Sequence, residues 1–217
     1  MTNDPLQIKH FVFGPFQTNC YVVSNEQHTL LIDPACYTPY EQQQLYNYIN
    51  RQSIINRQSS NRQLSIVATH GHLDHLWGAA WATETWHTPV LMHEADIPLA
   101  RAMQQQYDMF GIRQKAIPFP IKPLNENKFS IFNFQFSIIS TPGHTPGSIC
   151  LYFPEDNVLF SGDTLFHMGY GRTDLPGGNF AQLMDSLERL MTLPPSTRVL
   201  PGHGEPTSIA INRLQGV

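Results

Sequence analysis

Residues 69–75 constrain this chain more than any other stretch, because they place several metal-ligand side chains directly after a predicted strand. The stretch consists of Thr69, His70, Gly71, His72, Leu73, Asp74 and His75. An apolar, partly β-branched run at residues 64–68 leads into it and predicts a short buried strand. Gly71 suits a tight turn at the end of that strand. We therefore expect these polar side chains on a loop at the mouth of a rigid sheet.

The histidines and the aspartate of this stretch predict metal binding. Side chains alternate in an extended segment, so His70 and His72 can point to the same side. Asp74 and His75 follow at the predicted start of a helix, so their side chains are expected to point in a different direction from those of His70 and His72. One short segment could therefore supply ligands to two adjacent metal ions. Ligand-type groups packed this closely need a shared cation or a costly desolvation. Imidazole and carboxylate together suit zinc, iron or manganese.

Three more candidate ligands stand in loop-like segments directly after predicted strands. They are His144 in residues 141–148, Asp163 in residues 161–164 and His203 in residues 201–204. The order of strand, turn and ligand therefore occurs four times along the chain. A common edge of the sheet is the simplest cause.

The chain opens with three predicted strands, residues 8–13, 20–23 and 28–33, which favour an antiparallel meander. Asp33 ends the third strand just before Pro34. It is either a turn-forming aspartate or a carboxylate that orients a metal-bound histidine or its loop, since such partners usually fix the imidazole ring.

Helices and further strands follow. Thr38, Pro39 and Glu41 match a capping box with proline at the first helical position, which predicts a helix to about residue 50 that buries Leu45 and Ile49. Residues 51–63 predict a polar, exposed connection, residues 76–81 a helix and residues 89–92 a short strand. This succession is typical of a layered α/β sheet.

The pattern loosens at residues 96–123, which predict a helix followed by an irregular flap over the substrate. Arg101, Tyr107, Arg113 and Lys115 either hold an anionic substrate there or belong to a solvated insertion.

Further along, residues 129–139 predict two strands around Asn133, and residues 148–153 and 158–160 predict a hairpin. Asn179 can cap a helix with one apolar face, and residues 198–200 predict a last strand. The residues of that face are Phe180, Leu183, Met184, Leu187 and Leu190.

Size and composition limit the possible partners. A length of 217 residues, with 41% hydrophobic and 14% charged residues, fits one compact domain. The net charge of −4 and the lack of a Lys/Arg run argue against nucleic-acid binding. The sequence shows neither a signal peptide nor an apolar stretch that could span a membrane, so we expect a cytoplasmic protein. Cys20, Cys36 and Cys150 are expected to be buried, reduced residues.

The candidate ligands carry a family resemblance that covers the whole chain. Residues 69–75 together with His144, Asp163 and His203 resemble the metallo-β-lactamase superfamily. Residues 162–166, residues 171–179 and the opening segment 14–21 resemble the small glyoxalase II-like hydrolases within it.

The resemblance implies an α/β (α+β) fold, a four-layer αββα sandwich formed by a single domain over residues 1–217, with the site at one end of its two sheets. It also implies two divalent metal ions, zinc in the first place, with iron or manganese as alternatives. His70, His72 and His144 would hold the first ion, Asp74, His75 and His203 the second, and Asp163 would bridge the two.

The resemblance further implies a hydrolase that cleaves a small thioester, of the S-2-hydroxyacylglutathione type, by attack of a metal-bridging hydroxide that Asp74 helps to orient. Two alternatives stay open: a mononuclear-iron persulfide dioxygenase, and a lactone or ester hydrolase on the same centre. β-Lactam hydrolysis is less expected, because His75 and Asp163 stand where those enzymes commonly have other residues.

Substrate contacts are less defined by the resemblance. Tyr170 either lines the substrate pocket or packs, and Arg172 either contacts the substrate or, as we prefer, forms a salt bridge with Asp174 that shapes the loop. Full-length glyoxalase II enzymes supply basic residues to glutathione from a helical C-terminal extension. This chain ends at Val217, soon after His203, which leaves the recognition of glutathione open.

Overall fold

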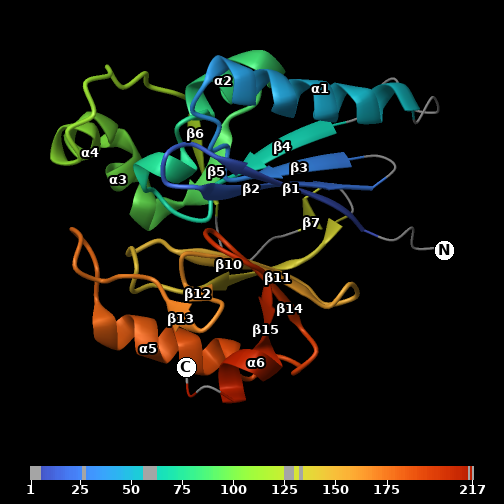
Figure 1. Cartoon of the computed structure of the whole chain (residues 1–217), viewed down its shortest axis with the longest axis vertical. Coiled ribbons are helices and arrows are strands. Elements are labelled where there is room, and N and C mark those ends of the chain that lie inside the picture. The colour runs from blue at the N-terminus through green and yellow to red at the C-terminus, as the bar shows by residue number, and fades with distance from the viewer. Residues whose placement is uncertain are drawn as a thin grey trace.

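Two β-sheets face each other in the computed structural model, and helices cover both outer faces (Figure 1). The structure describes residues 6–25, 28–55, 63–124, 130–131, 134–214 and 216. Among the helices in these ranges, none is both long enough and apolar enough to cross a membrane.

The first sheet has six strands in sequence order, and its first three form the predicted antiparallel meander. From the third strand onward the strands are parallel, so their C-terminal ends lie at one edge. The strands are β1 (Gln7–Phe13), β2 (Thr18–Ser24), β3 (His28–Ile32), β4 (Gln63–Val67), β5 (Val90–His93) and β6 (Ile121–Leu124).

Helix α1 (Pro39–Ile55) lies over the outer face of this sheet and begins with the predicted capping box. Thr38 Oγ1 accepts a hydrogen bond from Glu41 N at 3.2 Å, and Glu41 Oε2 accepts one from Thr38 N at 2.8 Å. Leu45 and Ile49 are buried, as expected. The helix nevertheless continues through residues 51–55, where we expected an exposed connection, because that segment holds neither a glycine nor a proline to end it. Residues 56–62 of that connection lie outside the described part of the chain.

Helix α2 (Ala79–Trp86) begins three residues later than the sequence suggests. Residues 76–78 form a turn instead, because Gly78 N donates to Pro34 O at 2.7 Å. A Cβ at Gly78 would overlap the sulfur of Cys36. Contact with a distant segment therefore sets the start of this helix.

Residues 96–123 are more ordered than a simple flap. A short 3₁₀ helix (Glu94–Asp96) leads into α3 (Ile97–Arg101) and α4 (Met103–Met109), which bury Met103 and Tyr107 against the first sheet's core. Residues 121–123 belong to β6. Only the part between α4 and β6 lacks regular structure, and whether it moves over a substrate remains a prediction.

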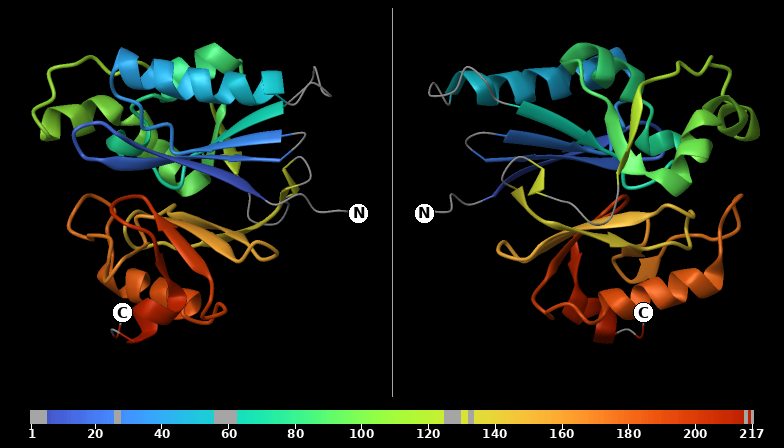
Figure 2. Two further views of the ribbon diagram at one scale, coloured as in Figure 1. Left: turned by 45° about the vertical axis from the view of Figure 1, so that its right-hand side comes forward. Right: turned by 180° about the vertical axis from the view of Figure 1, so that it is seen from behind.

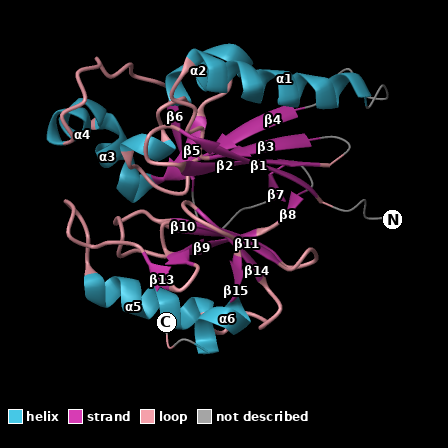
Figure 3. Ribbon diagram, in the orientation of Figure 1, coloured by secondary structure: helices cyan, strands magenta, loops and turns pink. Residues whose placement is uncertain are grey.

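The second sheet has the order β15-β14-β11-β10-β9 and includes the predicted hairpin between β10 and β11 (Figure 3). Two small strand pairs, β7–β8 and β12–β13, stand beside the main sheets. The strands are β7 (Ser130–Ile131), β8 (Phe134–Gln135), β9 (Ser137–Ser140), β10 (Ile149–Phe153), β11 (Val158–Gly162), β12 (Leu165–Phe166), β13 (Gly169–Tyr170), β14 (Arg198–Pro201) and β15 (Thr207–Ser208).

Helices α5 (Phe180–Leu190) and α6 (Ile209–Leu214) cover the outer face of the second sheet. Asn179 caps α5 as predicted, because its Oδ1 accepts a hydrogen bond from Gln182 N at 3.1 Å. The expected apolar face is correct at Leu183, Leu187 and Leu190, which are buried. It is wrong at Phe180, which is 54% exposed and contacts the ring of Tyr170 instead of the sheet.

The two sheets lie between the outer helices (Figure 2). Apolar side chains fill three layers: between the first sheet and its helices, between the two sheets, and between the second sheet and α5 and α6. Strand β2 shows why both sheets are needed, because Cys20 and Val22 face the first layer whereas Tyr21 and Val23 face the second. The expected αββα sandwich is confirmed. Cys20, Cys36 and Cys150 are buried free thiols.

The strand directions bring the loops with candidate ligands to one end of the sandwich. Strand β9 is antiparallel to β10, which is antiparallel to β11, and β11 is parallel to β14. The loops that follow β9, β11 and β14 therefore emerge at the same edge. They meet there the loop that follows β4 of the first sheet.

Candidate metal centre

All seven predicted ligands come together at this end of the sandwich. Their donor atoms form three groups, each with all atoms within 4.8 Å of one another. One group is His70, His72 and His144, the second is Asp74, His75 and His203, and the third is His70, His75 and Asp163. Asp74 and His75 belong to the short 3₁₀ helix Leu73–His75, at a helical start as the sequence suggested, although the ring of His75 still lies 4.1 Å from the ring of His70.

Asp163 lies between the first two groups. Its Oδ1 is 3.3 Å from His75 Nε2, and its Oδ2 is 3.5 Å from the Nε2 atoms of both His144 and His203. On the other side, Asp74 Oδ2 is 3.1 Å from His203 Nε2 and 3.5 Å from His75 Nε2. A single carboxylate thus approaches histidines from both groups.

The arrangement of the donor atoms suits bound cations better than hydrogen bonds between the donors themselves. Within the described residues, His70 Nε2 and Asp163 Oδ1 are buried and make no hydrogen bond. His72 Nδ1 and His144 Nε2 lie only 2.9 Å apart. Buried polar atoms without partners are costly, so a bound ion that accepts their lone pairs explains this arrangement. The residues present fit a His/Asp metal site.

The outer nitrogens of the histidine rings are held by other groups, which points the inner nitrogens at the centre. His144 Nδ1 lies 2.7 Å from Arg172 O, and His203 Nδ1 lies 3.1 Å from Phe16 O. His75 Nδ1 lies 2.9 Å from Asp33 Oδ2. These contacts fix the protons of the rings on the outside and leave Nε2 free to bind a cation.

Asp33 also holds the loop itself, which agrees with the orienting role, and its φ of 53° and the bond from Ala35 N to Asp33 O at 2.7 Å show that it forms a turn as well. Its carboxylate accepts hydrogen bonds from Thr69 N at 2.7 Å and from Thr69 Oγ1 at 2.8 Å. Together with its contact to His75, Asp33 therefore links both ends of the motif.

Two positioning residues on the first sheet's side were missed by sequence reasoning. Asp96, which is fully buried, accepts hydrogen bonds from Gly71 N, Thr145 Oγ1 and Gly147 N at 2.6–2.7 Å. Gln106 binds Leu73 N through Oε1 at 2.9 Å and Gly71 O through Nε2 at 3.0 Å. No local pattern marks them, because their partners lie 25 to 51 residues away in the chain.

The β1–β2 hairpin secures the other side of the centre. Thr18 Oγ1 donates to Asp74 Oδ2 at 2.7 Å. Asn19 Nδ2 donates to Pro201 O at 2.8 Å and to Gly204 O at 2.9 Å, on both sides of His203. The family-like segment 14–21 was the sequence signal for these residues, although it did not reveal what they contact.

Electrostatics favour neutral histidines in the first group. Burial, followed by the charge of His75, lowers the pKa of His70 well below its usual value. Burial and then His144 lower the pKa of His72 to about 3. Neutral imidazole is the form that binds metal, so these two rings are prepared for a cation rather than for a proton.

Around the second group the pKa of a histidine is raised rather than lowered, because the neighbouring carboxylates attract positive charge. Burial opposes the ionisation of Asp74 and Asp163, but the nearby histidines, His75 first and then His203, together outweigh it and lower the pKa of both carboxyl groups. Burial likewise opposes the charging of His75, yet Asp74 and Asp163 raise its pKa. The two carboxylates therefore favour a positive charge in the space that a cation would occupy.

A cavity of about 480 Å³ opens onto the centre. Tyr170 and Arg172 line it, and Arg172 forms the expected salt bridge with Asp174 through two contacts of 2.6 Å. Among the described residues the lining includes none of Arg101, Tyr107, Arg113 and Lys115. It is formed by Phe16, His72, Leu73, Asp74, Gln106, Phe110, His144, Asp163, Phe166, Tyr170, Arg172, Leu175 and His203.

Gly202 gives a test of the centre at a position that supplies no ligand. A Cβ there would overlap Asp163 Oδ1 and would lie 2.7 Å from His75 Cε1. We expect Gly202→Ala to lower metal affinity about 10- to 100-fold, by displacing both ligands. Metal retained after dialysis measures the effect. Gly169→Ala is the control, because a Cβ there meets no described atom within 4 Å. Equal metal retention by both variants would contradict the proposed packing of the ligands.

Known proteins with the same architecture resemble the chain over nearly its full length. The chain is 35% identical to a probable metallo-hydrolase, YqgX, of Bacillus subtilis, with 93% of this chain and 92% of the relative covered. It is 31% identical to the hydroxyacylglutathione hydrolase GloC of Haemophilus influenzae, with 89% of each protein covered.

The chain is also similar to solved structures over nearly its full length. TTHA1623 in a di-iron-bound form has a TM-score of 0.82 at 35% identity, over 94% of this chain and 96% of that protein. BLEG-1, described as a B3 metallo-β-lactamase, has a TM-score of 0.82 at 30% identity, over 96% and 99%. The family model of the metallo-β-lactamase superfamily matches residues 13–203. With its αββα fold and its centre of histidines and aspartates, the chain therefore belongs to the metallo-β-lactamase superfamily of metal-dependent hydrolases.

Proposed function

We propose that this protein hydrolyses a small thioester of the S-2-hydroxyacylglutathione type at a centre of two divalent metal ions. The observation that carries the proposal is the doubled ligand set, in which Asp163 lies between two groups that each hold three donors. The likeness to GloC, a hydroxyacylglutathione hydrolase, supports the substrate class.

The two groups divide the ligand roles. His70, His72 and His144 would hold one ion, Asp74, His75 and His203 the other, and Asp163 both. When bound there, two divalent cations would lower the pKa of a shared water and polarise the carbonyl of an acyl substrate. Zinc is the metal we propose, and the same ligands accept iron or manganese. A di-iron form of the similar TTHA1623 supports the paired centre.

The protein's own groups hold this centre in place. Thr18 Oγ1 donates to Asp74 Oδ2, the same oxygen that faces His203 and His75, and so fixes the carboxylate in its place in the second group. The main-chain oxygens of Arg172 and Phe16 accept hydrogen bonds from Nδ1 of His144 and His203, which directs Nε2 of both rings toward the centre. These contacts preorganise the donors before substrate binds.

The doubled ligand set favours this proposal over a mononuclear oxygenase. A persulfide dioxygenase with one iron would leave Asp74, His75 and His203 without a metal, although they are buried or nearly so and oriented toward one another. Lactone or ester hydrolysis uses the same centre and differs from thioester hydrolysis only in the leaving group.

Metal analysis combined with a substrate panel tests the proposal. The purified protein is loaded with zinc, iron or manganese, its metal content is measured, and turnover is recorded for thioesters, lactones, a β-lactam and glutathione persulfide. We expect two metals per chain and the highest kcat/KM for a thioester. One iron per chain with oxygen uptake on the persulfide, or faster turnover of the lactone or β-lactam, would overturn it.

A further inference from the structure

We propose that the cavity selects thioesters by an apolar group, aromatic or branched aliphatic, rather than by anionic groups such as the carboxylates of a peptide thiol. This inference rests on the proposed thioester hydrolysis and specifies which part of the substrate the protein recognises. It follows from the lining of the cavity, where two sets of aromatic and aliphatic side chains from separate parts of the chain accompany the ligand residues.

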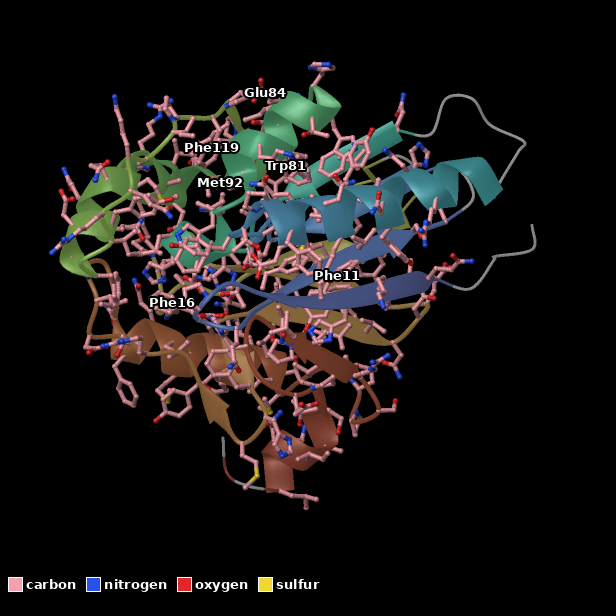
Figure 4. All side chains as sticks on the ribbon, turned by 45° about the horizontal axis from the view of Figure 1, so that its top comes forward. Phe11, Phe16, Trp81, Glu84, Met92 and Phe119 are labelled. Atoms are coloured by element: carbon pink, nitrogen blue, oxygen red, sulfur yellow. The ribbon has the colours of Figure 1, made fainter. Side chains whose placement is uncertain are left out.

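The first wall consists of Phe16 and Phe110, whose rings meet edge to face at 5.6 Å. Both rings are about two-fifths exposed, so they present apolar surface to the cavity. Phe16 lies near the turn of the β1–β2 hairpin, away from Phe11 on its strand (Figure 4). Behind it, the ring of Trp77 lies 5.2 Å away and is itself 4.7 Å from Tyr37. This stack holds Phe16 in place, so the wall is preorganised for an apolar group.

The second wall comes from the other half of the chain. Phe166 and Tyr170 belong to the small β12–β13 pair, and Leu175 follows them. The ring of Phe166 packs against the ring of His203 at 6.3 Å, and Tyr170 contacts Phe180 at 6.1 Å. An apolar substituent in the cavity can therefore contact rings from either half of the chain while its carbonyl faces the metal centre.

The charges of the cavity disfavour an anionic group. Arg172 is the one Arg or Lys among the described lining residues. Its Nε and Nη2 atoms each donate a hydrogen bond of 2.6 Å to the carboxylate of Asp174. Asp74 and Asp163 add negative charge at the bottom of the cavity, which bound cations would offset. A carboxylate at either wall would meet an arginine whose charge Asp174 already offsets, whereas a ring needs no such partner.

Two substrate series with similar reactivity separate the acyl half from the thiol half. In the first, phenylacetyl, acetyl and succinyl groups are joined to N-acetylcysteamine. In the second, the phenylacetyl group is joined to N-acetylcysteamine or to glutathione. We expect kcat/KM to be about tenfold or more higher for phenylacetyl than for acetyl or succinyl, and not to rise when glutathione replaces the neutral thiol. If an aromatic thiol ester of acetate shows the same gain, the thiol half supplies the apolar group instead.

Variants of the first wall identify the residues responsible. We expect Phe16→Ala and Phe110→Ala each to lower the phenylacetyl-to-acetyl ratio of kcat/KM about tenfold, mainly through KM. Met109→Ala is the matched control, because Met109 is 56% exposed and adjacent to Phe110 but does not line the cavity. A preference for succinyl or for the glutathione thioester, or an unchanged ratio in both wall variants, would overturn the inference.

A binding measurement keeps this inference separate from the proposed reaction. Calorimetry compares two thioethers that cannot be hydrolysed, S-phenacyl- and S-acetonyl-N-acetylcysteamine. If the metal-loaded protein cleaves no thioester, the proposed function fails, yet tighter binding of the phenacyl compound would still support the apolar cavity. Equal binding of the two compounds would refute the cavity's selectivity, whatever the turnover.

Discussion

Replacing Asp163 with asparagine is expected to reduce the metal content to one ion or fewer per chain and to lower kcat/KM about a thousandfold or more. The physical reason is that the Asp163 carboxylate lies between the two donor groups, 3.3 Å from His75 Nε2 and 3.5 Å from those of His144 and His203. Several kcal/mol of transition-state stabilisation come from paired cations, and each 1.4 kcal/mol is about tenfold in rate. Elemental analysis and steady-state kinetics measure the two effects.

Asp185→Asn is the matched control, because it replaces the same side chain in the same way. Asp185 is exposed on α5 and is not one of the ligands. It should leave both metal content and turnover unaltered. If Asp163→Asn kept two metals per chain and normal turnover, Asp163 could not bridge them, and the assignment of the two groups to one paired centre would be wrong.

Replacing Asp96 with alanine is expected to destabilise the protein by about 3 kcal/mol, since it leaves Gly71 N, Thr145 Oγ1 and Gly147 N without their buried acceptor. For a chain of this size that corresponds to a fall in Tm of about 10 °C. Asp96 also joins the loop of His70 and His72 to the loop of His144, so metal affinity should fall about 10- to 100-fold. Calorimetry gives the Tm, and competition with a chelator gives the affinity.

Asn157→Ala separates this positioning role from general destabilisation. Asn157 lies in the β10–β11 turn and bonds Ser196 Oγ at 2.7 Å and Thr197 Oγ1 at 2.9 Å, so its loss should also lower the Tm. Because none of these groups touches the ligand loops, metal affinity measured well below the Tm should stay unchanged. Equal losses of affinity in the two variants would assign Asp96 a purely structural role.

Local signals predicted most elements of the fold. The capping box at Thr38 and Glu41 and the cap at Asn179 act within three residues of themselves, so the sequence alone located both helix starts. The apolar strands were found for the same reason, because alternation is a property of neighbouring residues. One error was local, because residues 51–55 hold no glycine or proline and α1 continues through them. The other errors came where distant contacts decide. Pro34 and Cys36 set the start of α2, and Phe180 turns to Tyr170 instead of to the sheet.

The candidate site divides in the same way. The seven donor residues could be named in advance, because each follows a strand in a turn of recognisable composition. Their supports could not: Asp96, Gln106 and Thr18 are ordinary residues in sequence, and they matter only because folding brings them to Gly71, Leu73 and Asp74.

By itself, the sequence determined the types of ligand, the strands that carry them and the superfamily, since these depend on residue chemistry and on spacing along the chain. The division of the donors into two groups with Asp163 between them was implied by the family resemblance. The tertiary structure alone decided the distances between these donors, the contacts that hold them and which walls enclose the cavity. The physical reason is that strand direction and sheet packing bring together side chains far apart in sequence, and the distances between them follow from contacts that no local pattern encodes.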